Sequence, residues 1–324
     1  MSDQRSVVIT GLGPISSIGI GRDDFWAGLE EGRCGCRPPQ RLRGDWPALP
    51  QVAECLDFVV EDYLETEKTY LDRCSEFVLA ACSLALADAG LNWRELNHPR
   101  FGLSIGTAFG CLDSMHNVTA RVQGKGLRFA SPMIFTHSFA NSPASLAAIE
   151  YKIEGPVSTV CCGGTSAGEA LRYALDLVRY GRAEVMLAGG ADVLSEALLA
   201  ALNAAGGCAE GVPGEGACLL VLEPEDAALA RGAQPLARLR GVGLAGGPGL
   251  DPQAALAAAV QDASRAKIPE LFPAPQVWGH TFAAQMALDV AAALRTLPSQ
   301  APPLAIQSTD PSGRAAAVVV QRYP

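Results

Sequence analysis

The segment from Gly155 to Gly181 reads GPVSTVCCGGTSAGEALRYALDLVRYG and joins a strand pattern to a helix pattern. Its β-branched run predicts a strand over Val157–Cys161, and apolar residues at helical spacing predict a helix over Thr165–Arg179. Two adjacent cysteines lie at the junction, just before two glycines that permit a sharp turn. The cysteine at such a turn is either a nucleophile or a small buried thiol.

A cysteine at the end of this strand would lie near unpaired backbone N–H groups and the positive end of the helix dipole. That environment lowers the pKa of a thiol and favours the nucleophilic thiolate, so we expect a lowered pKa at Cys161. A buried strand-end thiol is the alternative for this residue. We expect Cys162 to point the other way, into the core.

A cysteine that transfers acyl groups usually needs a histidine as base, and the chain contains four histidines. His280 is the informative one, because it follows Trp278 and Gly279 and opens a predicted helix over Thr281–Leu294. A helix N-terminus keeps an imidazole neutral and able to share a hydrogen bond with a reacting oxygen. The alternative is a residue at the start of a helix with no catalytic role.

The 324-residue chain is acidic, with a formal net charge of −9, which argues against nucleic acid or an anionic membrane as its main partner. It has no signal-peptide pattern and no transmembrane-length apolar run, so we expect a cytoplasmic protein with ten reduced cysteines. Cys34 and Cys36 lie one residue apart, but no second pair with ligand spacing follows. We therefore expect no metal and no cofactor.

Strand and helix patterns alternate along the chain, which predicts a layered α/β fold. The other predicted strands are Ser6–Gly11, Phe101–Ile105, Glu184–Ala188, Ala217–Glu223, Leu304–Gln307 and Ala315–Gln321. The other predicted helices are Asp23–Glu31, Leu71–Ala89 and Ser138–Ile149. Glycine and proline become frequent after Gly206, which indicates shortened connections there.

Several of these segments, taken in order, resemble the β-ketoacyl-acyl-carrier-protein synthases, the ketosynthases of the thiolase fold. They are VVITGLGPISSIG, FGLSIGTAFG, the segment around the paired cysteines, GEGACLLVLEPEDAALARGA and GHTFAAQMALDV. The resemblance covers almost all of residues 5–235 and patches beyond. It implies an αβαβα layered fold with pseudo-duplicated halves, one over residues 1–205 and a shortened one over residues 206–324, which together form one compact unit.

The resemblance places the family's nucleophile at Cys161 and one of its catalytic histidines at His280. Other catalytic positions depart from the family pattern. The family's second histidine lies in an HGTGT-like loop, and residues 236–279 contain neither the loop nor a histidine. The family's lysine, five residues before the GHT histidine, is replaced by Pro275.

The family's glycine-rich gate, which resembles NSFGFGG, is replaced by QSTDPSG. The gate positions are therefore held by Thr309, Pro311 and Gly313. In the family one oxyanion-hole donor is the backbone N–H of the gate's second aromatic residue, and proline has no N–H. Losing such a donor costs a rate factor on the order of 10²–10³. The resemblance therefore implies a chain that does not condense acyl units by itself.

These departures resemble a chain-length factor, which pairs with an intact ketosynthase and shapes the acyl tunnel in type II polyketide or fatty-acid-like, including aryl-polyene-type, biosynthesis. In the family the segment before the nucleophile strand reaches the neighbouring subunit. The candidate tunnel or interface residues are therefore Met133, Ile134, Phe135, His137 and Phe139, with ordinary core as the alternative. An acyl carrier protein is acidic, so we expect it to dock mainly through the partner.

Two other functions remain open. In the first, Cys161 takes an acyl group from a carrier protein and, with His280 as base, passes it to an alcohol, an amine or water. In the second, the chain is an inactive homodimeric scaffold.

Overall fold

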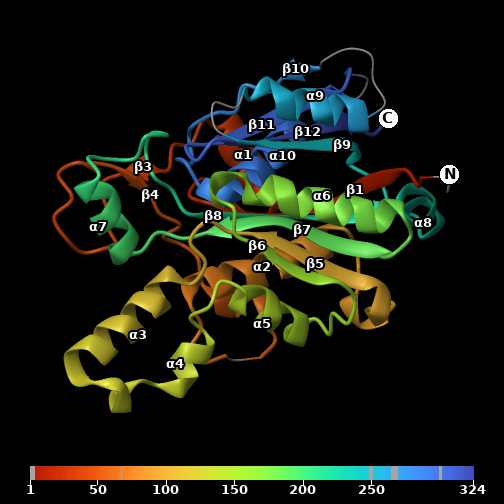
Figure 1. The fold of residues 1–324 in the computed structure, drawn as a ribbon. Coiled ribbons are helices and arrows are strands. Elements are labelled where there is room, and N and C mark those ends of the chain that lie inside the picture. The colour runs from red at the N-terminus through yellow and green to blue at the C-terminus, as the bar shows by residue number, and fades with distance from the viewer. Residues whose placement is uncertain (1–3, 67, 248–250, 264–268, 299–300) are drawn as a thin grey trace.

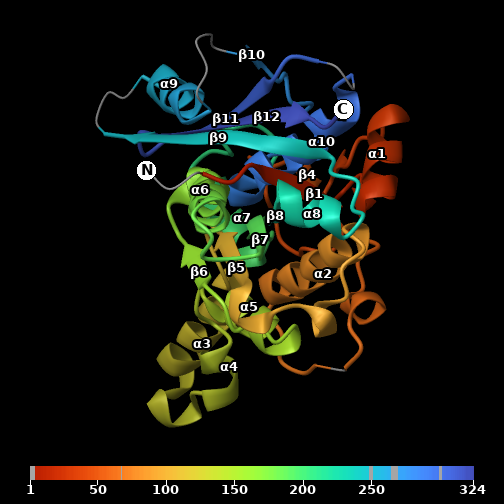
Figure 2. The same ribbon diagram turned by 90° about the vertical axis from the view of Figure 1, so that its right-hand side faces the viewer.

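The computed structural model describes residues 4–66, 68–247, 251–263, 269–298 and 301–324 of the chain. Helices and sheets alternate in five layers, and Figure 1 and Figure 2 show the layers from two sides. Helix α9 covers one outer face, α6 and α10 lie in the middle layer, and α2 and α5 cover the other outer face. This arrangement confirms the predicted thiolase-like α/β class.

The strands are β1 (Val7–Ser16), β2 (Gly19–Ile20), β3 (Cys36–Arg37), β4 (Val52–Ala53), β5 (Phe101–Gly106), β6 (Val157–Val160), β7 (Val185–Asp192), β8 (Gly216–Pro224), β9 (Ala237–Gly246), β10 (Glu270–Leu271), β11 (Leu304–Asp310) and β12 (Arg314–Arg322). The α-helices are α1 (Arg22–Glu30), α2 (Arg73–Asp88), α3 (Leu112–Lys125), α4 (Pro132–Thr136), α5 (Ser142–Glu150), α6 (Ser166–Arg179), α7 (Glu196–Ala204), α8 (Glu225–Ala230), α9 (Gln253–Asp262) and α10 (Gln285–Thr296). Short 3₁₀ turns are η1 (Val60–Tyr63), η2 (Trp93–Glu95), η3 (His98–Arg100), η4 (Leu127–Phe129), η5 (Gly163–Thr165) and η6 (Phe282–Ala284).

The long strands follow the order β10-β11-β12-β9-β1-β8-β7-β5-β6. Strand β1 pairs with β8 along most of its length but meets β9 only at Val8 and Ile9. This narrow contact joins the two layers of strands. Strand β5 is parallel to both β6 and β7, as strands connected through helices usually are. Strand β6 is the last strand in this order, next to β5.

The middle layer is buried on both sides, which explains the composition of its helices. In α10 every residue from Gln285 to Leu294 is buried, because the helix packs between the two layers of strands. Helix α6 buries one stripe, including Ala167, Leu171 and Val178, between the sheets. Alanine is common at these positions because its small side chain lets a helix and a sheet pack closely.

Each predicted strand and helix is present, with shifts at the ends. The predicted helix over Ser138–Ile149 starts later, at Ser142, because the short helix α4 and a turn precede it. The predicted helix over Thr281–Leu294 starts at Gln285, because η6 comes first with Phe282 at a φ of 50°. The sequence did not predict α3, α7, α9 or β9, and the division into halves at residues 205 and 206 stays a prediction.

Close packing of β1 on α2 depends on a glycine, which gives a stability prediction. A Cβ atom on Gly13 would lie 2.1 Å from the carbonyl oxygen of Ala81. We expect Gly13→Ala to lower the free energy of unfolding by about 1–3 kcal/mol, because β1 and α2 must move apart. The measurement is urea denaturation followed by circular dichroism.

Gly124 provides the matched control for this substitution. It lies in α3, and a Cβ atom there would have no neighbour within 4 Å. Gly124→Ala should stabilise the protein by about 0.5–1 kcal/mol, because alanine loses less backbone entropy in a helix. Equal effects of the two substitutions would contradict the packing of β1 on α2.

Candidate active site

The two adjacent cysteines lie at a sharp turn between β6 and α6. Strand β6 ends at Val160, and η5 and α6 follow. Gly163 has a φ of 72°, a conformation that glycine adopts without strain. Ser166 closes the turn, because its Oγ accepts a hydrogen bond from the Cys162 N–H at 2.8 Å and donates to the Gly163 carbonyl at 2.6 Å. The predicted strand, turn and helix are confirmed.

The Cys161 thiol is exposed, but it is not activated in the way the sequence predicted. Burial of the thiol, followed by the negative charge of Asp192, raises the pKa of Cys161 above its ordinary value of 9.0. The expectation of a lowered pKa was therefore wrong, because burial and the charge of Asp192 disfavour the thiolate. At neutral pH Cys161 is a thiol.

The placement of Cys162 also differs from the prediction. Its side chain is half-buried, not part of the core. Burial and a hydrogen bond with Glu169 raise the pKa of this thiol, and Arg314 acts in the opposite direction. Glu169 and Arg314 form an ion pair at 3.3 Å and line a hollow of about 680 Å³. Cys162 therefore faces a polar cluster at the protein surface.

Asp192, at the end of β7, is a buried carboxylate that binds three backbone N–H groups and a hydroxyl. The Thr107 hydroxyl donates to it at 2.8 Å, and the N–H groups of Ala108, Phe109 and Ala283 donate at 2.9–3.0 Å. Burial nevertheless raises the pKa of Asp192 to about 6, so the penalty of desolvation exceeds the effect of these donors. Asp192 thus ties the turn after β5 to η6.

His280 is held by its backbone in an irregular segment before η6. Its N–H donates to the Val212 carbonyl at 2.7 Å, and its own carbonyl accepts from the Gly214 N–H at 2.8 Å. Burial lowers the pKa of the imidazole, which keeps it neutral near pH 7. The neutral state was predicted, but its predicted cause was wrong, because α10 begins five residues later, at Gln285.

Aromatic contacts connect the histidine with the turn after β5. The ring of Phe282 packs edge-on against His280, with ring centroids 5.0 Å apart, and against Phe109 at 4.9 Å. Asp192 accepts hydrogen bonds from the N–H groups of Phe109 and Ala283 and raises the pKa of Cys161. Asp192 thus binds the segment that follows His280 through Ala283, and it lies near enough to Cys161 for its charge to raise the pKa of that thiol.

The predicted gate residues lie at the hairpin between β11 and β12. Thr309 lies in β11, Pro311 in the turn, and Gly313 has a φ of 83°. The carboxylate of Asp310 accepts a hydrogen bond from the Gly164 N–H at 2.6 Å and from the Ser312 N–H at 2.8 Å. Although burial acts to raise the pKa of Asp310, these hydrogen bonds lower it, so the group is an anion at neutral pH.

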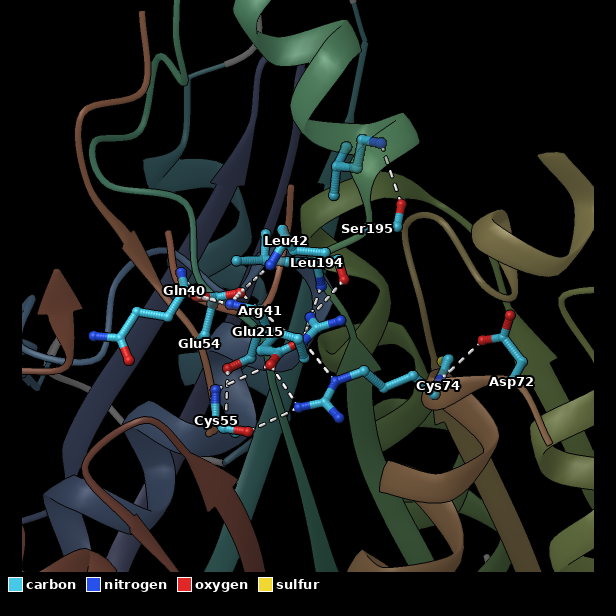
Figure 3. A network of polar contacts seen from close by, with 12 residues as sticks. Gln40, Arg41, Leu42, Glu54, Cys55, Asp72, Cys74, Leu194, Ser195 and Glu215 are labelled. Carbon is cyan, nitrogen blue, oxygen red and sulfur yellow. Dashed lines mark hydrogen bonds and ion pairs between the residues drawn. The ribbon is translucent and has the colours of Figure 1, made fainter. Parts of the chain in front are cut away.

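A buried ion network supports the site from the side of β8, and Figure 3 shows it from close by. Glu215 is fully buried and binds Arg73 at 2.7 Å and Arg41 at 3.0 Å. Glu54, also fully buried, accepts hydrogen bonds from the N–H groups of residues 40–42. Glu215 directly follows Gly214, whose N–H bonds His280, so the network fixes the backbone that holds the histidine.

The predicted tunnel or interface residues lie on a projection that we call the arm, residues 112–139, formed by α3, η4 and α4. The arm extends away from the layers in Figure 1 and Figure 2. Met133, Phe135 and Phe139 are exposed, and the Phe135 and Phe139 rings pack edge-on at 4.9 Å. Ile134 and His137 are half-buried. Ordinary core, the alternative for this set, is wrong.

Within the ranges that the structure describes, no group of three or more histidine, cysteine, aspartate or glutamate side chains is placed to hold a metal ion. Every helix in the same ranges is too short or too polar to cross a membrane.

A family model, the N-terminal domain of beta-ketoacyl synthases, matches residues 4–228. The 3-oxoacyl-[acyl-carrier-protein] synthase 2 of Synechocystis is 33% identical over 260 residues, which cover 72% of this chain and 61% of that protein. The tetracenomycin polyketide synthase ketoacyl synthase alpha subunit of Streptomyces glaucescens is 31% identical over 265 residues, which cover 74% and 62%. The chain belongs to the beta-ketoacyl synthase family, and the match spans about three-fifths of these relatives.

Solved structures show the same fold. The ishigamide ketosynthase/chain length factor matches with a TM-score of 0.89 and 22% identity, over 99% of this chain and 100% of that chain. A type II polyketide acyl carrier protein in complex with its ketosynthase gives a TM-score of 0.84 and 22% identity, over 99% and 100%. At this level of identity the likeness establishes the thiolase fold.

Sequence reasoning missed the carboxylates around the site. Asp192 ends a buried strand after two glycines, a signal for a polar group at a strand end that received no role. Asp310 lies between the predicted gate residues Thr309 and Pro311 and received no role of its own. The pairing of Glu215 with Arg41 and Arg73 joins residues more than 140 positions apart, and no local pattern indicates it.

The pKa of Cys161 gives a pH prediction. Because burial and Asp192 raise this pKa above 9.0, less than about 1% of Cys161 is thiolate at pH 7. The rate of Cys161 alkylation by iodoacetamide should therefore rise about tenfold per pH unit between pH 7 and 9. Mass spectrometry of the labelled peptide gives the rate, and Cys161→Ala gives the background from other thiols. A plateau below pH 8 would contradict the raised pKa.

Proposed function

We propose that this chain is a non-condensing subunit similar to a chain-length factor. It pairs with an intact ketosynthase and shapes the tunnel for the growing acyl chain in type II polyketide or fatty-acid-like biosynthesis. Family membership and the thiolase fold support the general role. The finer role depends on the altered chemistry around Cys161.

The contact between Asp310 and Gly164 is the observation on which the proposal mainly depends. The Gly164 N–H, beside the nucleophile, already donates a hydrogen bond to the Asp310 carboxylate. The Cys162 N–H likewise donates to the Ser166 hydroxyl. Pro311 has no N–H to offer an oxyanion. With a thiol of raised pKa, the turn has the shape of a nucleophile site, but it lacks the thiolate and the gate N–H that support condensation.

The arm and the edge of the sheet support a partner subunit. Leu127, Met133 and Phe135 expose 77%, 54% and 47% of their surface and all lie on the arm, and apolar side chains gathered on one projection favour an interaction surface. Among the described residues, strand β6 pairs only with β5, and it exposes Val157, so its other edge offers unpaired backbone groups. An intact ketosynthase with a matching edge strand and apolar surface is the partner we propose for both features.

An acyl carrier protein is the second partner in this proposal. The carrier is acidic, and this chain has a formal net charge of −9, so like charges disfavour direct docking. The carrier would deliver its acyl group mainly through the intact ketosynthase.

The first experiment replaces Cys161 in the presence of an active ketosynthase and a loaded carrier protein. Cys161→Ala should keep at least half of the product, because the partner performs the chemistry. Size-exclusion chromatography checks assembly, and mass spectrometry of the carrier-bound products gives the yield. Loss of product from a complex that still assembles would overturn the proposal.

The same complex tests the role of the arm. Phe135→Ala should lengthen the products, because a smaller side chain leaves more room for the acyl chain near the interface. Leu229→Ala is the control, since Leu229 is similarly exposed but lies on α8, far along the sheet from the arm. A product distribution that Phe135→Ala leaves unchanged would count against a tunnel role.

An acyltransferase remains the second candidate, because Cys161 is exposed and His280 is neutral. In this function Cys161 holds the acyl group and His280 acts as base. The two candidates differ in one result: an acyltransferase loses all product when Cys161 becomes alanine.

A further inference from the structure

A second pair of cysteines, Cys34 and Cys36, lies outside the site in the segment after α1. Cys34 is exposed and Cys36 is half-buried. The two thiols are near enough for the charge of Cys34 to raise the pKa of Cys36. Residues separated by one position have α-carbons within about 7 Å, near the upper end of the range that a disulfide bridges.

Contacts on both sides hold this pair in place. The N–H of Gly35 donates to the Val277 carbonyl at 2.8 Å, and a Cβ atom on Gly35 would lie 1.9 Å from the Ser17 Oγ. Only glycine fits between the two cysteines. Cys36 itself lies in β3, where it pairs with Ala53 of β4.

The pair packs against the loop that leads to His280. The Cys36 Sγ lies 3.9 Å from the carbonyl oxygens of Gln276 and Val277. The Gly279 N–H acts to lower the pKa of this thiol, and His280 is the next residue. A change in the position of the Cys36 sulfur therefore acts directly on the backbone that places the imidazole.

We propose that Cys34 and Cys36 form a reversible redox modification site that reacts with a low-molecular-weight disulfide such as oxidised glutathione. Closing the Cys34–Cys36 disulfide shifts the loop at residues 276–280. This inference does not depend on the proposed function, because it concerns the position of His280 and not the reaction that the site performs.

The oxidation proceeds in two exchange steps. The exposed Cys34 loses its proton to solvent and attacks one sulfur of oxidised glutathione; the glutathione disulfide breaks and one glutathione thiolate leaves. Cys36 then loses its proton and attacks the Cys34 sulfur, and the second glutathione leaves. Two protein thiols are oxidised to one disulfide, and one glutathione disulfide is reduced to two thiols.

Cys34 reacts before Cys36, because Cys36 is half-buried and its thiol is more difficult to ionise. Burial, followed by the charge of Cys34, raises the pKa of Cys36 to about 11, while the Gly279 N–H and Arg37 act in the opposite direction. Little Cys36 thiolate is present at pH 7, so the mixed disulfide on Cys34 forms first and the internal disulfide follows. Closure then draws the Cys36 sulfur away from the two carbonyls.

The experiment treats the full chain with oxidised glutathione and maps its disulfides by peptide mass spectrometry. In parallel, NMR follows the His280 imidazole signals, assigned with His280→Asn. We expect a Cys34–Cys36 peptide lighter by two hydrogens, a shift of the His280 signals, and reversal of both by dithiothreitol. Cys208→Ser is the control, because Cys208 is also half-buried but adjoins Glu210 instead. This variant should respond like the wild type.

Cys34→Ser should show neither the disulfide nor the histidine shift. Cys36→Val, which keeps an apolar side chain at the half-buried position, should stop at the mixed disulfide on Cys34 and also leave the histidine signals unchanged. Two results would overturn the inference. One is a wild-type chain that stops at the mixed disulfide, and the other is a Cys34–Cys36 disulfide that leaves the His280 signals in place.

Discussion

The buried carboxylate of Asp192 is the constraint on which the site depends. It lies at the end of β7 and accepts hydrogen bonds from the turn after β5 and from Ala283 in η6. Burial raises its pKa to about 6, because desolvation disfavours the carboxylate more than the four hydrogen-bond donors favour it. The hydrogen bonds of this buried carboxylate hold two separate segments of the chain together. Through it the turn after β5 and the segment that follows His280 occupy fixed positions relative to one another.

The framework around this carboxylate is intact, whereas the groups that would react are altered. Glu215 and its two arginines brace the backbone beside His280, and the turn after β6 has the strand-to-helix form of a nucleophile site. Yet Asp310 binds the Gly164 N–H, Pro311 lacks an N–H, and the Cys161 thiol has a raised pKa. This combination of a retained framework and altered reacting groups is the basis of the proposed non-condensing role.

The sequence predicted the elements of the fold well, because buried strands and amphipathic helices leave strong local patterns, as in Val157–Cys161 and Thr165–Arg179. It predicted electrostatics poorly. The pKa of Cys161 depends on burial and on Asp192, and the pKa of His280 depends mainly on burial, which no local pattern reveals. The arm was also missed as a structure, since α3 buries only Val118 and thus has little apolar periodicity. Its role in binding a partner and the half boundary at residue 205 stay predictions.

Decarboxylation of a malonyl thioester tests the central claim most directly. The purified chain is incubated with malonyl-loaded acyl carrier protein, and carbon dioxide release is measured with and without an intact ketosynthase. A chain without a competent gate should release none above the uncatalysed background when alone, and the mixture should release carbon dioxide with product. Turnover by the chain alone, lost in His280→Asn, would contradict the account.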